Sequence, residues 1–127
     1  MLQGCSKKRP DIYFELNKHC IIVEVDENQH KGYDDSCECA RINEIVNGIG
    51  GRSLIFIRFN PDVVKYKGKK MHISLQDRLD LLVYTIKLYL VQEPSWFSIL
   101  MVQLYYDCHH NYFKCCQIEN ITKQVCI

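Results

Sequence analysis

Three carboxylates near the N-terminal end of the chain have the types and spacing for metal-ion chemistry. Asp11 begins one strand-like run, and Glu24 and Asp26 close the next one. Side chains repeat every second residue along a strand, so Glu24 and Asp26 share a face. Carboxylate oxygens suit Mg²⁺ or Mn²⁺, which bind through one or two carboxylates together with water and substrate phosphates. Phosphodiester cleavage is the chemistry expected there, and the alternative is a solvent-facing set of acids with a structural role.

A short hairpin must bring these acids together. Residues 11–16 alternate in polarity and residues 20–25 are rich in β-branched side chains, so both runs are predicted to be strands, with Asn17-Lys18 as the turn. Asp11 then lies opposite Glu24, with Cβ atoms about 4.5–5.5 Å apart, where like charges repel unless something offsets them. The opposite face carries the apolar residues that we expect to anchor the hairpin on a core: Ile12, Phe14, Leu16, Ile21, Val23 and Val25.

A β-α-β unit is expected to follow the hairpin. Asp35-Ser36-Cys37-Glu38 has the form of a capping box, and apolar residues recur at helical spacing, so we predict a helix from about Ser36 to Gly48. Leu54 to Phe59 is a nearly continuous apolar run, typical of a strand covered on both faces. A crossover of this length gives parallel, right-handed pairing. The predicted fold class is α/β, with a mixed central sheet that contains an antiparallel hairpin and a β-α-β crossover.

The ordered series of these motifs resembles the PD-(D/E)xK nuclease superfamily, which has the restriction-endonuclease-like fold. The resemblance covers about the first half of the chain and depends on the order of the motifs rather than on any single one. Within the superfamily, this series of motifs is similar to a group of proteins from large DNA viruses and some eukaryotes, and more distantly to the very-short-patch repair endonucleases. The residues that carry it are Arg9-Pro10-Asp11, Glu24-Val25-Asp26 within 21–30, Glu38-Cys39-Ala40-Arg41 and 56–62.

The resemblance implies a role for each matching residue. Asp11 and Glu24 would be the ligands of Mg²⁺ or Mn²⁺, with the Val25 carbonyl as a third, and His30 occupies the position of a functional histidine in the repair enzymes. Asp26 stands where the motif has a lysine, so His30 or Lys31 would replace that lysine, or the site would be inactive. Glu38 and Arg41 share a helix face and would flank the site; the alternative for this pair is a surface salt bridge.

The start of the chain departs from the family pattern. Only ten residues precede Asp11, where nucleases of this fold place a helix and a first strand. We therefore expect an N-terminally reduced domain, or one completed in a homodimer or larger assembly. The viral members of the group imply a location in a virus-infected cell.

Length and composition set limits on these expectations. The chain has 127 residues, of which 47% are hydrophobic and 24% charged, which favours one globular domain over a disordered or membrane protein. We divide it into a core of about 9–62, a helix and edge strand within 74–107, and a tail of 108–127. No signal peptide precedes the first strand, so the eight cysteines are interpreted as free thiols in the cytoplasm or nucleus.

Four lysines are the candidate nucleic-acid contacts. The net charge of +1 does not by itself indicate a nucleic-acid partner. Cations beside an acidic metal site are nevertheless what a phosphate backbone requires, since each contact releases counterions. The alternative is a solvated connection. The lysines crowd a Gly-containing loop around Tyr66: Lys65, Lys67, Lys69 and Lys70.

The second half of the chain offers less chemistry. An apolar stripe after Ser74 predicts a helix that ends before Pro94 and packs on the core. Residues 99–106 are predicted to form an edge strand, and residues 117–127 a frayed or partner-bound tail. Cys108-His109-His110 and Cys115-Cys116 do not have the spacing of a structural zinc site.

Two functions from different classes remain open. The first is a Mg²⁺-dependent endonuclease that acts on DNA, with His30 as a proton shuttle. The second is a catalytically inactive nuclease-like fold that serves as a nucleic-acid-binding or assembly module.

Overall fold

The computed structural model describes residues 10–27 and 35–124. It begins with the expected hairpin, formed by β1 (Ile12–Glu15) and β2 (His19–Val25). Phe14 pairs with Ile21 and Ile12 with Val23, which is the predicted register. The Leu16 amide donates to the His19 carbonyl at 3.0 Å, so the turn is at the expected two residues.

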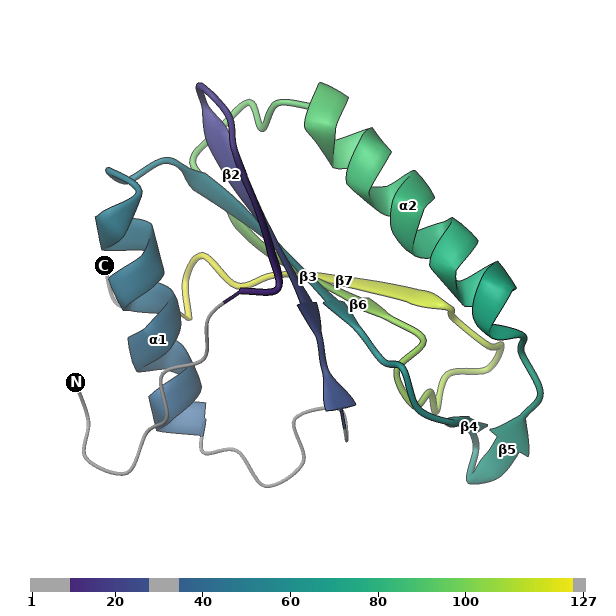
Figure 1. Cartoon of the computed structure of the whole chain (residues 1–127). Coiled ribbons are helices and arrows are strands. Elements are labelled where there is room, and N and C mark those ends of the chain that lie inside the picture. The colour runs from purple at the N-terminus through teal and green to yellow at the C-terminus, as the bar shows by residue number, and fades with distance from the viewer. Residues whose placement is uncertain (1–9, 28–34, 125–127) are drawn as a thin grey trace.

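Five strands form one mixed sheet between two helices (Figure 1). After β2 come α1 (Asp35–Gly48) and β3 (Ser53–Phe59), and later α2 (Leu75–Val91) and β6 (Ile99–Leu104). The strands β2, β3 and β6 are parallel, and the expected β-α-β crossover is therefore confirmed and followed by a second one through α2. The antiparallel strands β1 and β7 (Cys116–Asn120) form the edges, in the order β1-β2-β3-β6-β7.

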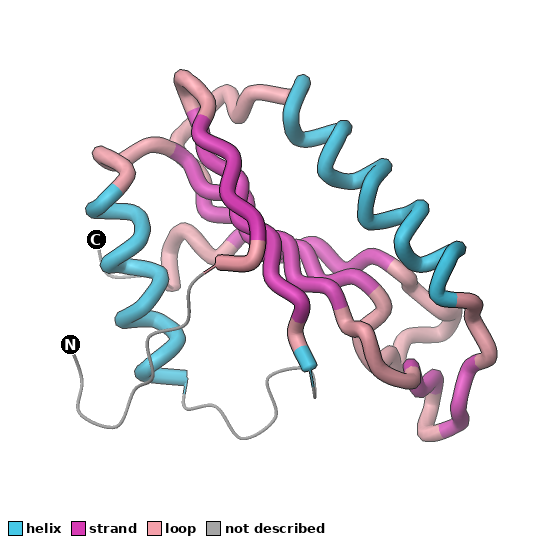
Figure 2. The backbone as a smooth tube through the Cα atoms, viewed as in Figure 1, coloured by secondary structure: helices cyan, strands magenta, loops and turns pink. Residues whose placement is uncertain are grey.

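Each helix covers a different face of the sheet (Figure 2). The alternation of side chains along β2 sends Ile22 toward α1 and Ile21 toward α2, and both are almost fully buried. The run at β3 is apolar because both its faces are covered, as its composition predicted. The face that carries the acids is therefore not a solvent face, because Cys20 and Ile22 on it pack under α1.

The helices begin and end where local chemistry allows. The Ser74 hydroxyl accepts a hydrogen bond from the Asp77 amide at 3.1 Å and caps α2. The Gly51 amide donates to the Val46 carbonyl at 3.1 Å just after α1, and Gly50 there has φ +74°, a conformation that glycine adopts at little cost. The predicted capping box of α1 involves residues 35–37, whose side chains lie outside the described part.

Three expectations for the second half were wrong. The strand at 99–104 is internal rather than at the edge, because β7 pairs with it. Residues 116–120 are accordingly a strand and not a frayed tail. The lysine-rich segment is a two-stranded ribbon rather than a loop, formed by β4 (Val64–Tyr66) and β5 (Lys69–Met71).

The described residues contain no helix that is long and apolar enough to cross a membrane.

Candidate functional site

The parallel strands β2, β3 and β6 have their carboxyl ends at the same end of the sheet, where α/β proteins commonly bind ligands. Below, this edge of the sheet means the line of these carboxyl ends and not an edge strand. In the β2–β3 register Glu24 pairs with Arg58, and in the β3–β6 register Arg58 pairs with Gln103. Glu24, Arg58 and Gln103 therefore form a row of polar residues across three neighbouring strands, on the face of the sheet that α1 covers. Most of that face is otherwise apolar, so this row marks the candidate site.

Glu24 is the centre of a buried ion-pair cluster. Its side chain is fully buried, and Arg41 from α1 donates to both of its oxygens, Nη1 to Oε1 at 3.2 Å and Nη2 to Oε2. Arg58 Nε lies 3.9 Å from Glu24 Oε1. Bidentate guanidinium–carboxylate pairs combine charge with fixed geometry, and a buried carboxylate is tolerated only with such partners. The negative charge of Glu24 is thus offset by two arginines.

The cluster also includes Glu38 and an aromatic ring. Arg58 Nη2 forms an ion pair with Glu38 Oε1, so two carboxylates and two guanidinium groups balance one another. The guanidinium carbons of Arg58 and Arg41 lie 4.6 Å and 5.5 Å from the ring centre of Phe56. Both distances are within the range of cation–π attraction. We call Glu24, Glu38, Arg41 and Arg58, with Phe56 beneath them, the ion-pair cluster.

Glu38 and Arg41 are brought together as expected, but they do not form a surface salt bridge. Each pairs with a strand residue instead, Glu38 with Arg58 and Arg41 with Glu24. They lie three residues apart on the helix face that covers the strand ends. Across-layer pairs of this kind hold α1 to the sheet as well as neutralising the buried acids.

Asp11 lies at the open end of the hairpin. Its Oδ2 accepts a hydrogen bond from the Val25 amide at 2.7 Å, and its own amide donates to the Val23 carbonyl at 3.1 Å. The Asp11 side chain is exposed, whereas Glu24 is buried. Asp11 therefore contacts the backbone of β2 on both sides of Glu24, at Val23 and Val25, and remains open to solvent.

Asp26 is buried at the end of β2, with 1% of its surface exposed. Its amide donates to the Phe59 carbonyl at 2.7 Å and continues the β2–β3 ladder. Next to it, Asn60 is fully buried, and its side-chain amide donates to the Tyr105 carbonyl at 2.9 Å. The ends of β2, β3 and β6 are thus held in place by buried polar groups.

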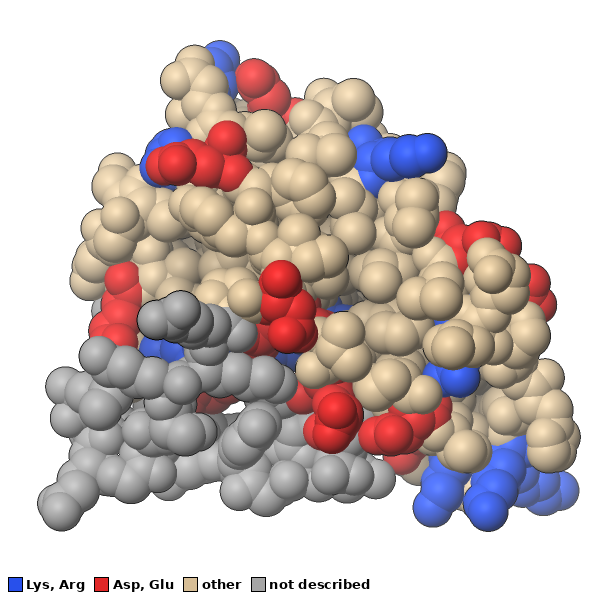
Figure 3. All heavy atoms as spheres, in the orientation of Figure 1, with Lys and Arg blue, Asp and Glu red and all other residues tan. Residues whose placement is uncertain are grey.

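The predicted lysine contacts extend from the same end of the sheet. Lys65 pairs with Lys70 and Tyr66 with Lys69 across the β4–β5 ribbon. The turn residues Lys67 and Gly68 both have positive φ, as a tight hairpin turn requires. In Figure 3 the blue atoms of lysine and arginine gather where Figure 1 places the ribbon, and red carboxylates follow the same edge toward the middle of the molecule.

The donor set at this edge has the right chemistry for a hard divalent cation, because the acids supply only oxygen. Within residues 10–27 and 35–124, however, no three His, Cys, Asp or Glu side chains are grouped as ligands of one metal. Both oxygens of Glu24 already contact guanidinium groups. His30 and Lys31, the candidates to replace the motif lysine, lie outside the described residues.

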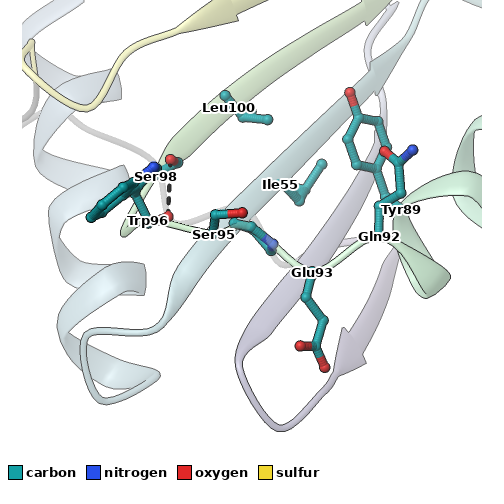
Figure 4. Close-up of a pocket in the computed structure, with 9 residues that line it drawn as sticks. Ile55, Tyr89, Gln92, Glu93, Ser95, Trp96, Ser98 and Leu100 are labelled. Carbon is teal, nitrogen blue, oxygen red and sulfur yellow. Dashed lines mark hydrogen bonds between the residues drawn. The ribbon is translucent and has the colours of Figure 1, made fainter.

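A cavity of about 310 Å³ opens at the opposite edge of the sheet, between the end of α2 and the start of β6 (Figure 4). None of the predicted site residues lines it. Its walls are mostly apolar or uncharged, and they include Ile55, Tyr89, Gln92, Trp96, Ser98 and Leu100. The charged residue among those that line it is Glu93, whose exposed carboxylate pairs with Lys18 at 3.5 Å.

Comparison with models of protein families, with curated proteins and with solved structures found no match.

Sequence reasoning missed Arg58 as a site residue. The signal was a single charged residue inside the otherwise apolar run of β3. An arginine in a buried strand requires acidic partners that offset its charge. Glu24, its neighbour in the β2–β3 register, and Glu38 on α1 are these partners.

Proposed function

We propose that this chain is a metal-dependent endonuclease that hydrolyses phosphodiester bonds in DNA, with a reduced restriction-endonuclease-like fold. The observation that carries the proposal is the place of three acids at the carboxyl end of β2: Asp11 Oδ2 accepts from the Val25 amide, Glu24 pairs with Arg41 and Arg58, and Asp26 is buried directly after the strand. Asp11 and Glu24 would hold Mg²⁺ or Mn²⁺, with the Val25 carbonyl as a third ligand. The proposed fold family follows from the resemblance of the motifs.

The metal and the residues at the carboxyl ends of the strands would have separate roles in catalysis. When bound, the metal would lower the pKa of a water molecule and offset the charge that develops on the phosphate. Arg41 and Arg58 present guanidinium groups that suit phosphate oxygens, because their fixed donors match that geometry. Glu38 pairs with Arg58, and Asp26 is buried directly after β2. His30 is proposed as the proton shuttle.

A second function is favoured by one observation. Both oxygens of Glu24 are already occupied by Arg41, and Arg58 lies beside them. A site whose central acid is neutralised within the protein suits a nucleic-acid-binding or assembly module without catalysis. Asp26 in the position of the motif lysine points the same way.

Nicking of supercoiled DNA in Mg²⁺ or Mn²⁺ separates the two functions. The wild type is compared with Asp11→Asn and Glu24→Gln, and with Glu93→Gln as a matched control, since Glu93 is an exposed acid paired with Lys18 at the far edge. The endonuclease proposal expects nicking by the wild type and the control, and a loss of about 100-fold or more in the two site variants.

Each other outcome has a defined meaning. If the wild type binds DNA but does not nick it in either metal, the endonuclease proposal is wrong and the binding module is retained. Equal nicking by the wild type and both site variants would place cleavage outside this edge of the sheet. Urea unfolding of Glu24→Gln shows whether its loss of activity reflects the site or the fold, because Glu24 is buried. Asp11→Asn changes an exposed residue and should leave the fold intact.

A further inference from the structure

The lysine ribbon is joined to a second segment that sequence analysis did not connect with it. The Lys67 amide donates to the Cys108 carbonyl at 2.9 Å, and the Cys108 amide donates to the Lys65 carbonyl at 3.0 Å. These bonds place residues 108–114 alongside β4, where Tyr66 and Cys108 form a β-bridge. We call the β4–β5 ribbon together with 108–114 the ribbon surface.

The ribbon surface carries an excess of positive charge, with one carboxylate at its border, where Asp107 Oδ1 accepts from the Lys65 amide at 3.0 Å. Neither 63–76 nor 108–118 contains an acidic residue, and the four ribbon lysines are joined by Lys114. Lys65 and Lys70 are directly paired across the ribbon and both are exposed. Like charges in that position destabilise a strand pair. An anionic partner would remove this repulsion, and a phosphate backbone supplies regularly spaced negative charge.

Aromatic rings are interleaved with these cations. The Tyr66 hydroxyl donates to the His110 carbonyl at 3.0 Å, and its ring meets Phe113 edge to face at 5.8 Å. Tyr66 and Phe113 thus fix the loop against the ribbon. Tyr112 is different, because 67% of its surface is exposed while Cys108 Sγ contacts its carbonyl at 3.7 Å. Its ring is presented to solvent by a tethered backbone, with Lys114 Nζ 5.5 Å from the ring centre.

We infer that the ribbon surface binds single-stranded nucleic acid, with the lysines on phosphates and the Tyr112 ring stacked on a base. Aromatic rings beside a positive groove bind single strands with little sequence preference, because every base has a face to stack. A duplex keeps its bases stacked on one another and offers no such face to Tyr112. The inference deepens the proposed function by naming the strand state of its substrate, and rests on that proposal only for what happens after binding.

Fluorescence anisotropy in EDTA tests binding without cleavage. The full chain is titrated into a labelled oligonucleotide of about 15 nucleotides, comparable to a few site sizes, and into the duplex of the same sequence. Tyr112→Ala and Tyr112→Leu are expected to weaken single-strand binding about 5–50-fold, the loss of one stacked base, and to change duplex binding by less than about twofold. Tyr112→Phe keeps the ring and is expected to bind like the wild type.

Tyr84→Ala is the matched control, because Tyr84 is equally exposed, at 63%, but lies on α2. It should leave single-strand binding unchanged. The inference is overturned if Tyr112→Ala and Tyr112→Leu bind the single strand like the wild type. It is also overturned if they lose as much affinity for the duplex, or if Tyr112→Phe is as weak as they are. The comparison of Leu with Phe separates a lost aromatic face from a lost contact of any kind.

The lysines have a separate signature. The slope of the logarithm of the binding constant against the logarithm of the salt concentration reports the number of phosphate contacts. The double variant Lys69→Ala/Lys70→Ala is expected to lower this slope for the single strand by the equivalent of about one to two contacts, whereas Lys87→Ala on α2 leaves it unchanged. An unchanged salt dependence in the double variant would overturn the role of the ribbon. Binding in EDTA requires neither metal nor cleavage, so failure of the nuclease proposal leaves these binding results intact.

Discussion

The two faces of the central sheet differ in the side chains that they bury at the strand ends. On the α1 face, an apolar cluster with Ile22, Val46 and Phe56 gives way at the strand ends to the ion-pair cluster around Glu24. On the α2 face, the apolar cluster extends to the strand ends, where Phe59 and Leu104 are buried. Apolar packing stabilises without direction, whereas buried charges must be held in register. The α1 face therefore carries the ion-pair cluster, and the α2 face carries the larger share of the apolar core.

Breaking the ion-pair cluster is expected to have the largest effect. Arg58→Met keeps the volume of the side chain but removes the ion pairs that Arg58 makes with Glu38 and with the buried Glu24. Removal of one partner from a buried ion pair costs about 3–5 kcal/mol, which urea unfolding would measure as a lower midpoint. Lys18→Met is the control, because its pair with Glu93 is exposed on both sides, at 66% and 54%, and should cost less than about 1 kcal/mol. Equal costs for both variants would contradict the contrast between the faces.

A cavity on the α2 face should cost less and change only stability. Leu82 is buried against the sheet, and Leu82→Ala is expected to lower the free energy of unfolding by about 2–4 kcal/mol. Leu75→Ala on the same helix should change it by less than about 0.5 kcal/mol, since Leu75 is 52% exposed. Nucleic-acid binding by the folded Leu82→Ala protein should match the wild type. A selective loss of binding there would show that the α2 face also belongs to the site.

The start of α2 offers a smaller test of what stabilises that face. Ser74→Ala removes the hydroxyl that accepts from the Asp77 amide and should cost about 1 kcal/mol in urea unfolding. Ser74→Asp keeps an acceptor at this position and is expected to retain most of the stability. If Ser74→Asp were as unstable as Ser74→Ala, the effect would come from a contact other than the cap.

Alkaline pH should affect both faces slightly. On the α1 face the Tyr13 hydroxyl donates to Cys20 Sγ at 3.4 Å, which raises the pKa of Tyr13 to about 12. On the α2 face burial raises the pKa of Tyr89 and of Tyr105. A raised pKa means that the folded state holds the proton more tightly, so this stability is complete below about pH 10 and is lost as the pH rises toward 12.

Near-ultraviolet absorbance during alkaline titration checks this expectation. Tyr13→Phe should remove one tyrosine from the latest phase and make the loss of stability above about pH 10 shallower. A titration in which Tyr13→Phe matches the wild type would show that the hydrogen bond to Cys20 does not hold the proton.

The sequence by itself determined the elements whose signals are local. The register of the first hairpin, the helices near 36–48 and 75–90 and the buried strand at 54–59 follow from turn chemistry, capping and periodicity within a few residues. It also indicated which acids would share one edge, because the register of a two-residue hairpin follows from its turn.

Only the tertiary structure decided the pairings between distant segments. The position of β7 beside β6, the attachment of Cys108 to the ribbon and the place of Arg58 between Glu24 and Glu38 all join residues far apart in the chain. Such contacts depend on which edges and charges remain unsatisfied after the local elements have formed. Their physical reason is the cost of leaving a backbone group or a buried charge without a partner, which short stretches of sequence do not reveal.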